Sequence, residues 1–204
     1  MKSIRLSLPG TFVITAAVVL LAGLAPAVAG GAGETPDLDR MRERLVATET
    51  PKQWEKRARE LLAELDRQGL SRSPEAFALV EQLIGVAPED PVLLWRRADM
   101  ERRSGKSEEA IADLEYLIEM AGDHPLAVRA RRALPALYLR VGRPEESARA
   151  DEVLLEEGLA DPVAVSIRLA HTYAALDRPE ALRRTLARLE SLAPSKRDTD
   201  PELM

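Results

Sequence analysis

The chain contains few side chains that could carry out catalysis or bind a metal ion. It has no cysteine and two histidines, His124 and His171, which excludes disulfides, thiolate metal sites and a cysteine nucleophile. No nucleophile or second base accompanies either histidine in a recognisable pattern, so we interpret His124 as a solvated turn residue and His171 as a structural helix residue. The motifs of zinc proteases, serine hydrolases and phosphate-binding loops are absent from the sequence. We therefore expect no catalytic residue, no metal site and no cofactor.

Adjacent glutamates are the remaining candidates for acid–base chemistry. Such pairs occur at Glu108-Glu109, Glu145-Glu146 and Glu156-Glu157. They fall at predicted helix starts or on exposed faces, and a glutamate in the first turn interacts favourably with the helix dipole. We interpret them as surface residues rather than as paired catalytic carboxylates. The protein is therefore expected not to be an enzyme; an all-helical enzyme with an unrecognised site is the alternative.

The charge balance argues against nucleic acid as a ligand. Lys and Arg total 29 and Asp and Glu total 34, which gives a formal net charge of −5 and a pI near 5.3. A broad basic face for DNA is not expected at this pI. With 3% aromatic residues, a base-stacking surface is not expected either.

Residues 1–29 have the pattern of a secretory signal peptide. Lys2 and Arg5 are the only charges among them, and a long apolar run follows that ends in small residues. A positive start, an apolar centre and an A-x-A site characterise such a signal, and Ala27-Val28-Ala29 is the best cleavage site. We expect Gly30 to be the first residue of the mature chain.

An uncleaved membrane anchor is the alternative for this segment. About 18 or more apolar residues can span a bilayer, and the run within residues 6–29 is long enough. In both interpretations Lys2 and Arg5 keep the N-terminus in the cytoplasm, and the rest of the chain lies outside it. We therefore expect an exported protein, periplasmic or secreted, or else one anchored in the inner membrane with its repeats in the periplasm.

A helical unit repeats along the rest of the chain. An acidic residue followed by a small one recurs in steps of 34, 37 and 34 residues, at Glu75-Ala76, Glu109-Ala110, Glu146-Ser147 and Glu180-Ala181. An apolar stripe with the spacing of one helix face accompanies each pair. In the second copy the stripe is Ala110, Ile111, Leu114, Leu117 and Ile118. In the third copy Asp151 interrupts the stripe.

Turn and capping residues recur with the same period. Four further helical segments are predicted at residues 54–68, 91–104, 125–141 and 162–176, and they end near Gly69, Gly105, Gly142 and Asp177. Four polar residues each precede a proline, as an N-cap precedes a proline at the first helical position; they are Thr50, Ser73, Asp90 and Asp161. The unit is therefore helix, short turn, helix, short turn, and no segment alternates like a strand.

This unit resembles the tetratricopeptide repeat (TPR), a helical hairpin of 34 residues. The residues that carry the resemblance are Leu169-Ala170-His171-Thr172-Tyr173 in a first helix, Ala110-Ile111, Leu114 and Leu117 in a second helix, and the closing prolines Pro88 and Pro194. Arg97, Glu101 and Ser147 depart from the family pattern, so the repeats are degenerate. We therefore expect an exported protein that resembles the TPR family, with degenerate repeats.

The resemblance implies an all-α fold: a right-handed α-solenoid of about four helix-turn-helix repeats over residues 51–194. Residues 30–50 are then a linker and a capping helix with Leu38, Met41 and Leu45 at helical spacing, and residues 195–204 a disordered tail. An ordinary helical bundle or another α-solenoid is the competing interpretation.

The resemblance also implies a partner-binding surface, because first helices of TPRs line a concave groove that takes extended peptides or partner helices. By position this surface comprises Trp95, Asp99, Arg102, Arg103, Arg129, Arg132, Leu139, Arg140, Ile167, His171 and Ala174. Arginine binds carboxylates with two parallel hydrogen bonds, so an acidic peptide is one candidate ligand, with Trp95 as an apolar anchor. The alternative is that the arginines are a solvated face and Trp95 belongs to the core. The asparagine–lysine arrangement with which some members grip a terminal carboxylate is not present.

These features favour a scaffold that recruits a protein or peptide partner in the bacterial envelope. The alternative is a membrane-anchored structural subunit of an envelope assembly, secretion or maturation complex, in which residues 6–29 stay attached.

Overall fold

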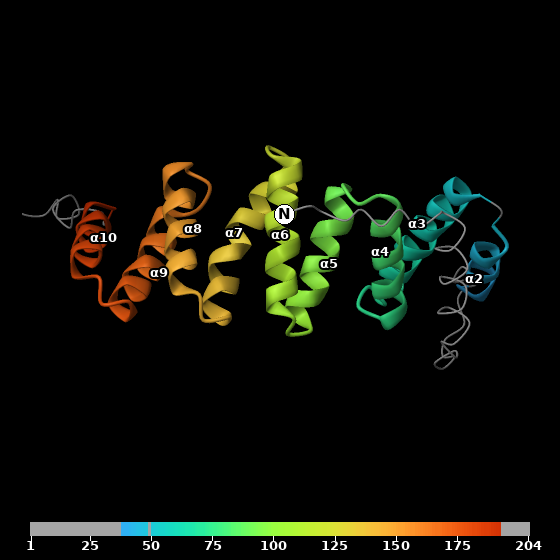
Figure 1. Ribbon diagram of the computed structural model, residues 1–204, viewed down its shortest axis with the longest axis horizontal. Helices are drawn as coiled ribbons and strands as arrows, with labels where there is room; N and C mark the ends of the chain where they lie inside the picture. Colours follow the sequence, from blue (N-terminus) through green and yellow to red (C-terminus); the bar gives the residue numbers. More distant parts are fainter. Residues whose placement is uncertain (1–37, 49, 193–204) are drawn as a thin grey trace, which may run out of the picture. The chain divides into compact units, whose positions relative to one another are not determined.

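Figure 1 shows the computed structural model, which describes residues 38–48 and 50–192. Every regular element in these residues is a helix. The helices are α2 (Leu38–Val46), α3 (Pro51–Arg67), α4 (Pro74–Val86), α5 (Pro91–Arg103), α6 (Ser107–Ala121), α7 (Pro125–Arg140), α8 (Pro144–Glu156), α9 (Pro162–Ala175) and α10 (Pro179–Leu192). The predicted all-α fold is confirmed for this part of the chain. The predicted signal segment, the start of the linker and the predicted tail lie outside the described residues.

Side-chain caps and prolines set the helix starts, as predicted. The Ser73 hydroxyl accepts a hydrogen bond from the Ala76 amide at 3.1 Å at the start of α4. The Asp161 carboxylate accepts one from the Val163 amide at 3.1 Å at the start of α9. Thr50 caps α3 and Asp90 caps α5 in the same way. The predicted boundaries of the first helices agree with the structure to within a few residues, because these caps determine where each helix can begin.

His124 has a role that the sequence did not predict. It lies in the turn before α7 and is exposed, as expected. However, its Nδ1 accepts a hydrogen bond from the Leu126 amide at 3.1 Å and so caps α7. Histidine is not among the residues that usually cap helices, so its type gave no signal of this role.

The turns inside the hairpins use left-handed backbone. Gly142, between α7 and α8, has a φ of 75°, which glycine adopts without a steric penalty. At the corresponding turn between α9 and α10, Asp177 has a φ of 51°. Aspartate is one of the few other residues that adopt this conformation. The position of this turn was therefore predictable although its glycine is missing.

The chain divides into two compact units, with the boundary after Met100. In the first unit, α2 packs on α3 and α3 on α4. The Arg42 guanidinium of α2 donates two hydrogen bonds to the Glu75 carboxylate of α4, at 2.7 and 2.6 Å. This ion pair links α2 to α4. The buried apolar residues of the unit include Leu45, Leu61, Leu65, Leu79 and Leu83.

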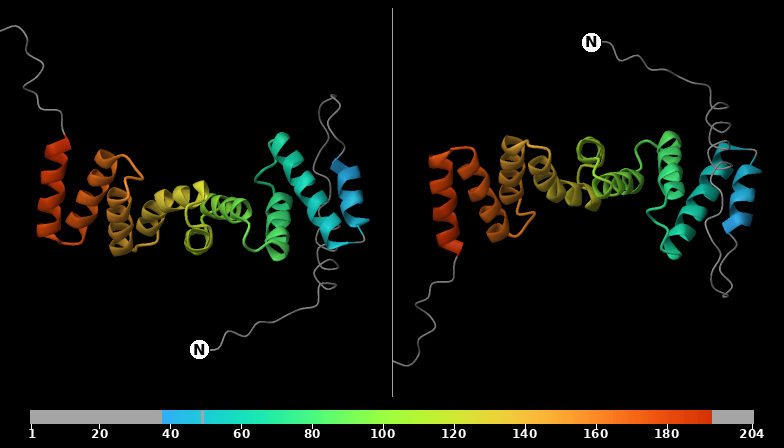
Figure 2. Two further views of the ribbon diagram at one scale, coloured as in Figure 1. Left: turned by 90° about the horizontal axis from the view of Figure 1, so that it is seen from above. Right: turned by 90° about the horizontal axis from the view of Figure 1, so that it is seen from below.

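In the second unit, helices α6 to α10 pack in succession, each mainly against its neighbours in the chain (Figures 1 and 2). Ala148 of α8 belongs to one apolar cluster with Val165 and Leu169 of α9. The predicted α6 residues Ala110, Ile111, Leu114 and Leu117 are at most 2% exposed. Because each hairpin is covered by the next, the core is built by stacking.

The last helix is an exception to this packing. Leu186 and Leu192 of α10 are 44% and 37% exposed, and Leu182 and Leu189 are half-buried. The arginines of this helix, Arg183, Arg184 and Arg188, are exposed as well, so its outer side carries both charged and apolar side chains.

Replacing Ala110 with phenylalanine tests the packing of α6. Ala110 is completely buried, and a larger side chain there must displace its neighbours, which lowers the free energy of unfolding by about 1–3 kcal/mol. We expect a lower thermal unfolding midpoint by circular dichroism. Ala112→Phe, at an exposed position of the same helix, should change the midpoint little. Equal midpoints for the two variants would contradict the stacked core.

Candidate functional site

Three of the predicted binding residues share one exposed side of α7. Arg129, Arg132 and Arg140 are exposed, together with Leu139. The other side of α7 is turned to the core, and its buried residues are Ala127, Ala130, Leu134, Pro135, Leu137 and Tyr138. The spacing of three to four residues that buries one set therefore places the other set in water.

The corresponding side of α9 carries the predicted residues Ile167 and His171. Both are exposed, and Ile167 is 47% exposed. Val165 and Leu169, on the opposite side, are 2% exposed. The solvent-facing side of α9 thus carries mostly small and apolar side chains, whereas that of α7 carries mostly arginines.

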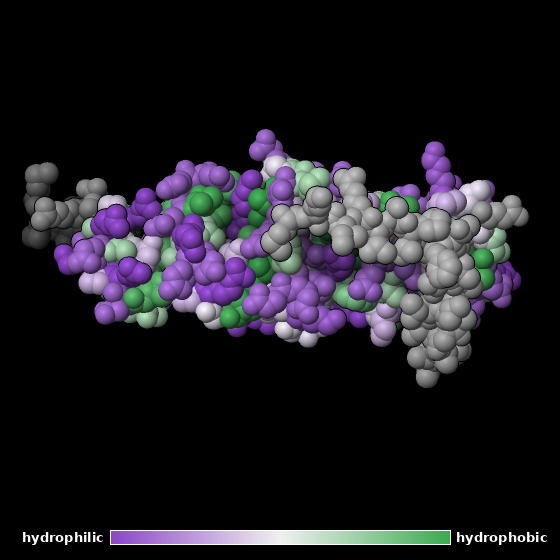
Figure 3. All heavy atoms as spheres, in the orientation of Figure 1, coloured by the Kyte–Doolittle hydropathy of each residue, from purple (hydrophilic) through white to green (hydrophobic). Residues whose placement is uncertain are grey.

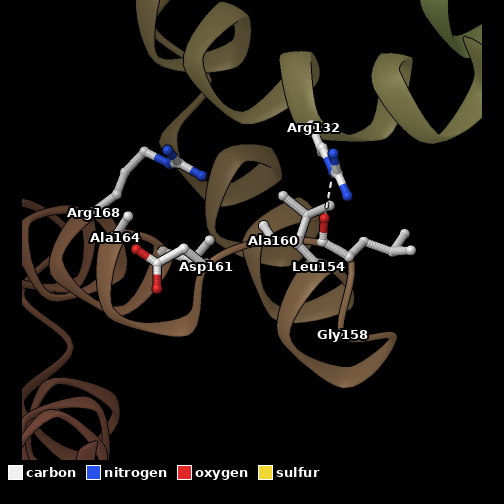
Figure 4. Close-up of a pocket in the computed structure, with 9 residues that line it drawn as sticks. Arg132, Leu154, Gly158, Ala160, Asp161, Ala164 and Arg168 are labelled. Atoms are coloured by element: carbon white, nitrogen blue, oxygen red, sulfur yellow. Dashed lines mark hydrogen bonds between the residues drawn. The ribbon is translucent and has the colours of Figure 1, made fainter.

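A cavity of about 400 Å³ lies between these two helices. Arg132 of α7 and Arg168 of α9 line it, together with the connection between α8 and α9. In Figure 4 the Arg132 side chain reaches toward this connection, whereas the Arg168 side chain lies on the opposite side of the cavity. The remaining lining residues are Leu154, Gly158, Leu159, Ala160, Asp161, Ala164 and Val165. We call this cavity, together with the exposed residues of the two helices, the α7–α9 surface; those residues are Arg129, Arg132, Leu139, Arg140, Ile167 and His171.

Arg132 is tied to the connection by its own hydrogen bond. Its Nε donates to the carbonyl oxygen of Leu159 (Figure 4). This bond orients the guanidinium at the edge of the cavity, and a guanidinium has further N–H groups to offer. Asp161 also lines the cavity, so its carboxylate offsets part of the positive charge there.

Arg168 and Asp151 are site residues that sequence reasoning did not identify. The Arg168 guanidinium donates two hydrogen bonds to the Asp151 carboxylate of α8, with Nε 2.7 Å from Oδ2. The Asp151 side chain is fully buried, whereas that of Arg168 is 30% exposed. Burial raises the pKa of Asp151 above its ordinary value, although the hydrogen bond from Arg168 acts in the opposite direction. That same bond raises the pKa of Arg168.

The sequence contained a signal for this ion pair. Asp151 interrupts the apolar stripe of its helix, and a carboxylate at a core position requires a partner. Arg168 lies on the facing helix and supplies it. The pair positions the guanidinium of Arg168 beside the cavity.

The predicted residues of α5 belong to different units. Trp95 and Asp99 lie in the first unit and are half-buried. Arg102 and Arg103 lie in the second unit, half-buried and exposed respectively. Nη1 of Arg140 is 3.4 Å from the carbonyl oxygen of Arg102. Within the second unit, the end of α5 therefore lies beside the arginine side of α7.

Charge is distributed unevenly over the helices of the second unit. α7 carries four arginines and no acidic residue, and α9 carries Arg168, His171 and no acidic residue. α6 carries five acidic residues and no basic one, and α8 carries five acidic residues and Arg149. The face of the molecule in Figure 3 is largely hydrophilic, with hydrophobic residues in small separate patches. Among the helices from α6 to α10, α7 and α9 are therefore the two that carry basic residues without acidic ones.

A second cavity, of about 590 Å³, lies between α8 and α10. Its charged lining is balanced, with Glu145, Glu152 and Glu180 against Arg149, Arg178 and Arg184. The Tyr173 hydroxyl donates to Glu152 at its base. Burial, followed by this hydrogen bond, raises the pKa of Tyr173 to about 12. The balance of charges gives this cavity no preference for an anion.

Among the described residues, no group of three or more potential ligands could hold a metal ion. The same residues include no helix that is long and apolar enough to cross a membrane. The glutamate pairs Glu108-Glu109 and Glu145-Glu146 lie in the first turns of α6 and α8. Their position agrees with the favourable interaction with the helix dipole that we expected.

Comparison with known proteins identifies structures with a similar fold. No family model matches the chain. A stretch of 75 residues is 36% identical to the TPR repeat-containing thioredoxin TTL4 of Arabidopsis thaliana, and covers 37% of this chain but 11% of that protein. The crystal structure of kinesin light chain TPR-like repeats from Podosopora anserina matches with a TM-score of 0.53 at 17% identity, over 92% of this chain and 90% of that one. The crystal structure of MamA matches with a TM-score of 0.53 at 14% identity, over 76% of this chain and 88% of that one.

The chain folds as a TPR-like repeat protein. The predicted fold class is therefore confirmed, and the competing interpretation of an ordinary bundle is wrong. The matched part of the Arabidopsis protein is a small fraction of its length, so that protein's activity as a whole is not transferred to this chain. TPR-like folds generally serve as protein-interaction scaffolds, because stacked repeats present extended binding surfaces.

Proposed function

We propose that this TPR-like protein is an exported, non-enzymatic interaction module that binds an acidic segment of a protein partner on its α7–α9 surface. The observation that carries the proposal is the charge of the two helices: α7 and α9 have arginines and no acidic residue in a chain with a net charge of −5. The local excess of positive charge attracts an acidic segment.

Exposed apolar residues within the surface support binding of a polypeptide rather than of a small anion. Leu139 of α7 is 39% exposed and Ile167 of α9 is 47% exposed. A peptide with acidic and apolar side chains satisfies both features, because its carboxylates pair with arginines while its apolar side chains cover these two residues.

Affinity capture tests this proposal. The chain as recovered from the cells that express it serves as bait in extracts of the same cells. We expect a protein with an acidic segment to be captured, and to be released when salt is raised from about 0.05 to about 0.5 M, because exposed ion pairs are screened. Capture of partners that resist salt and lack acidic segments would contradict the proposal.

The proposal of export rests on the pattern of the N-terminal segment, with Lys2 and Arg5 before an apolar run and Ala27-Val28-Ala29 at its end. We expect the mature chain to begin at Gly30 and to be recovered outside the cytoplasm. N-terminal sequencing or intact mass of the protein from fractionated cells measures this. A chain that begins at Gly30 but stays in the cytoplasmic fraction would contradict export.

The second candidate function is a membrane-anchored structural subunit of an envelope complex. It is favoured by the length of the apolar run within residues 6–29, which is sufficient to span a bilayer. In that case the intact chain should keep its N-terminal segment and remain in the membrane fraction after carbonate extraction. The same mass measurement therefore separates the two functions.

A further inference from the structure

The outer side of α10 corresponds to a side of α8 that another helix covers. Both helices begin with Pro-Glu, at Pro144 and Pro179, so in the structure their positions match in steps of 35 residues, one more than the spacing of the acidic–small pairs. On α8 the matching positions are Ser147, Asp151 and Leu154, which are at most 1% exposed. Asp151 is covered by α9 through its ion pair with Arg168.

On α10 these three positions are all leucines, and they are less buried than their counterparts on α8. Leu186 is 44% exposed, and Leu182 and Leu189 are half-buried. Their spacing of four and three residues forms the narrow apolar seam that packs against one further helix. The seam is more apolar than the covered side of α8, where serine and aspartate occupy two of the three positions.

We propose that this seam, consisting of Leu182, Leu186 and Leu189, pairs with the same seam of a second copy of the chain, with the two α10 helices antiparallel. The pairing continues the helix-on-helix stacking found between α8 and α9. It uses a surface distinct from the α7–α9 surface, so it is independent of the partner proposed above.

Charge complementarity favours a second copy of the chain as the partner of the seam, and it favours the antiparallel orientation. Arg183 and Glu190 are exposed and flank the seam on the same side, seven residues apart. In an antiparallel pair with Leu186 beside Leu189 of the second copy, Arg183 lies opposite Glu190 of that copy, and Glu190 opposite its Arg183. In a parallel pair Glu190 lies opposite Thr185 of the second copy, so the two Arg183–Glu190 contacts are lost.

The hydrogen bond that Arg183 makes within its own chain competes only weakly with the proposed contact to Glu190 of the second copy. It donates to Glu180 at 3.1 Å, but the two side chains are 74% and 75% exposed. Such an exposed pair contributes little, and a guanidinium can serve two carboxylates.

The first test is the mass of the protein in solution as its concentration is raised. A single-helix interface is small, so we expect a monomer that approaches twice its mass between about 0.1 and 1 mM. Leu186→Glu should abolish the increase. Val153→Glu, which changes a 41% exposed residue of α8, is the matched control and should retain it.

The second test uses reversed charges. Arg183→Glu and Glu190→Arg should each weaken self-association at least tenfold, because each creates two like-charge contacts across the pair. Mixing the two variants should restore association, since every contact then joins opposite charges.

The outcomes decide the proposal. A single-chain mass at about 1 mM, or an increase that Leu186→Glu leaves intact, overturns it. Failure of the mixed variants to associate better than either alone overturns the antiparallel arrangement. Loss of a captured partner on Leu186→Glu, with a single-chain mass throughout, replaces the second copy with a helix of another protein.

Discussion

Partner capture should fall roughly 100-fold when Arg129 and Arg132 are both changed to glutamate. Each reversal replaces an attractive contact with a repulsive one, and such a change is worth about 1–2 kcal/mol per contact at a partly exposed surface. Both residues are exposed on α7, so helicity measured by circular dichroism should be unchanged. Capture is measured with the native and variant chains as bait at equal concentration and low salt.

Two further variants make this result specific. The double variant Arg149→Glu with Arg184→Glu changes the net charge by the same amount as the first pair, but at exposed residues of α8 and α10. It should reduce capture little. Arg129→Glu with Arg140→Glu spares Arg132, whose hydrogen bond to Leu159 holds the connection, and should reduce capture as strongly as the first pair. Equal loss in the control pair would show that net charge alone is responsible and would remove the α7–α9 surface from the proposal.

The largest expected effect on stability comes from breaking the Asp151–Arg168 ion pair. Arg168→Leu leaves a carboxylate that is fully buried without its partner, and we expect a loss of about 3 kcal/mol of unfolding free energy. Asp151→Leu should be milder, at about 1 kcal/mol, because the partly exposed guanidinium of Arg168 can turn to water. The double replacement should lie near the native chain, since no buried charge remains. Chemical denaturation measures all three.

The Arg168→Leu variant should also depend on pH in a defined direction. The pKa of Asp151 is already raised by burial, and it rises further when Arg168 no longer opposes that effect. A carboxyl group whose folded pKa exceeds its unfolded pKa favours folding at low pH, and this contribution is lost as pH rises through the folded value. The deficit of the variant should therefore be smaller near pH 4 than near pH 7. A deficit that does not change with pH would contradict the burial of a charged Asp151.

The fold was predictable because local signals and the repeat agreed with each other. The cap-and-proline starts at Ser73 and Asp161 and the left-handed turns at Gly142 and Asp177 are encoded within a few residues. The apolar stripe of α6 then determined which side is buried. When capping, turn and burial signals coincide, helix boundaries follow from the sequence alone.

The site was predictable only in part, since it depends on contacts between helices. The spacing along α7 predicted that Arg129, Arg132 and Arg140 share a side. It did not predict the cavity, which requires α9 and the α8–α9 connection to meet Arg132. Nor did it predict Arg168, because its partner Asp151 is 17 residues away on another helix. Trp95, expected as an anchor, is half-buried, which a residue's type and helix position do not determine.

Packing between successive helices has a consequence for how the chain reaches its folded state. The substantial contacts within each unit join helices that follow one another along the chain, such as α6 with α7 and α7 with α8. A topology of this kind has a low contact order and folds quickly, because each helix makes its contacts with segments that are close to it in the sequence. A chain that passes unfolded through a membrane channel could then fold one hairpin at a time as it emerges. Folding would oppose movement of the chain back into the channel. It would also shorten the time during which exposed apolar stripes can aggregate.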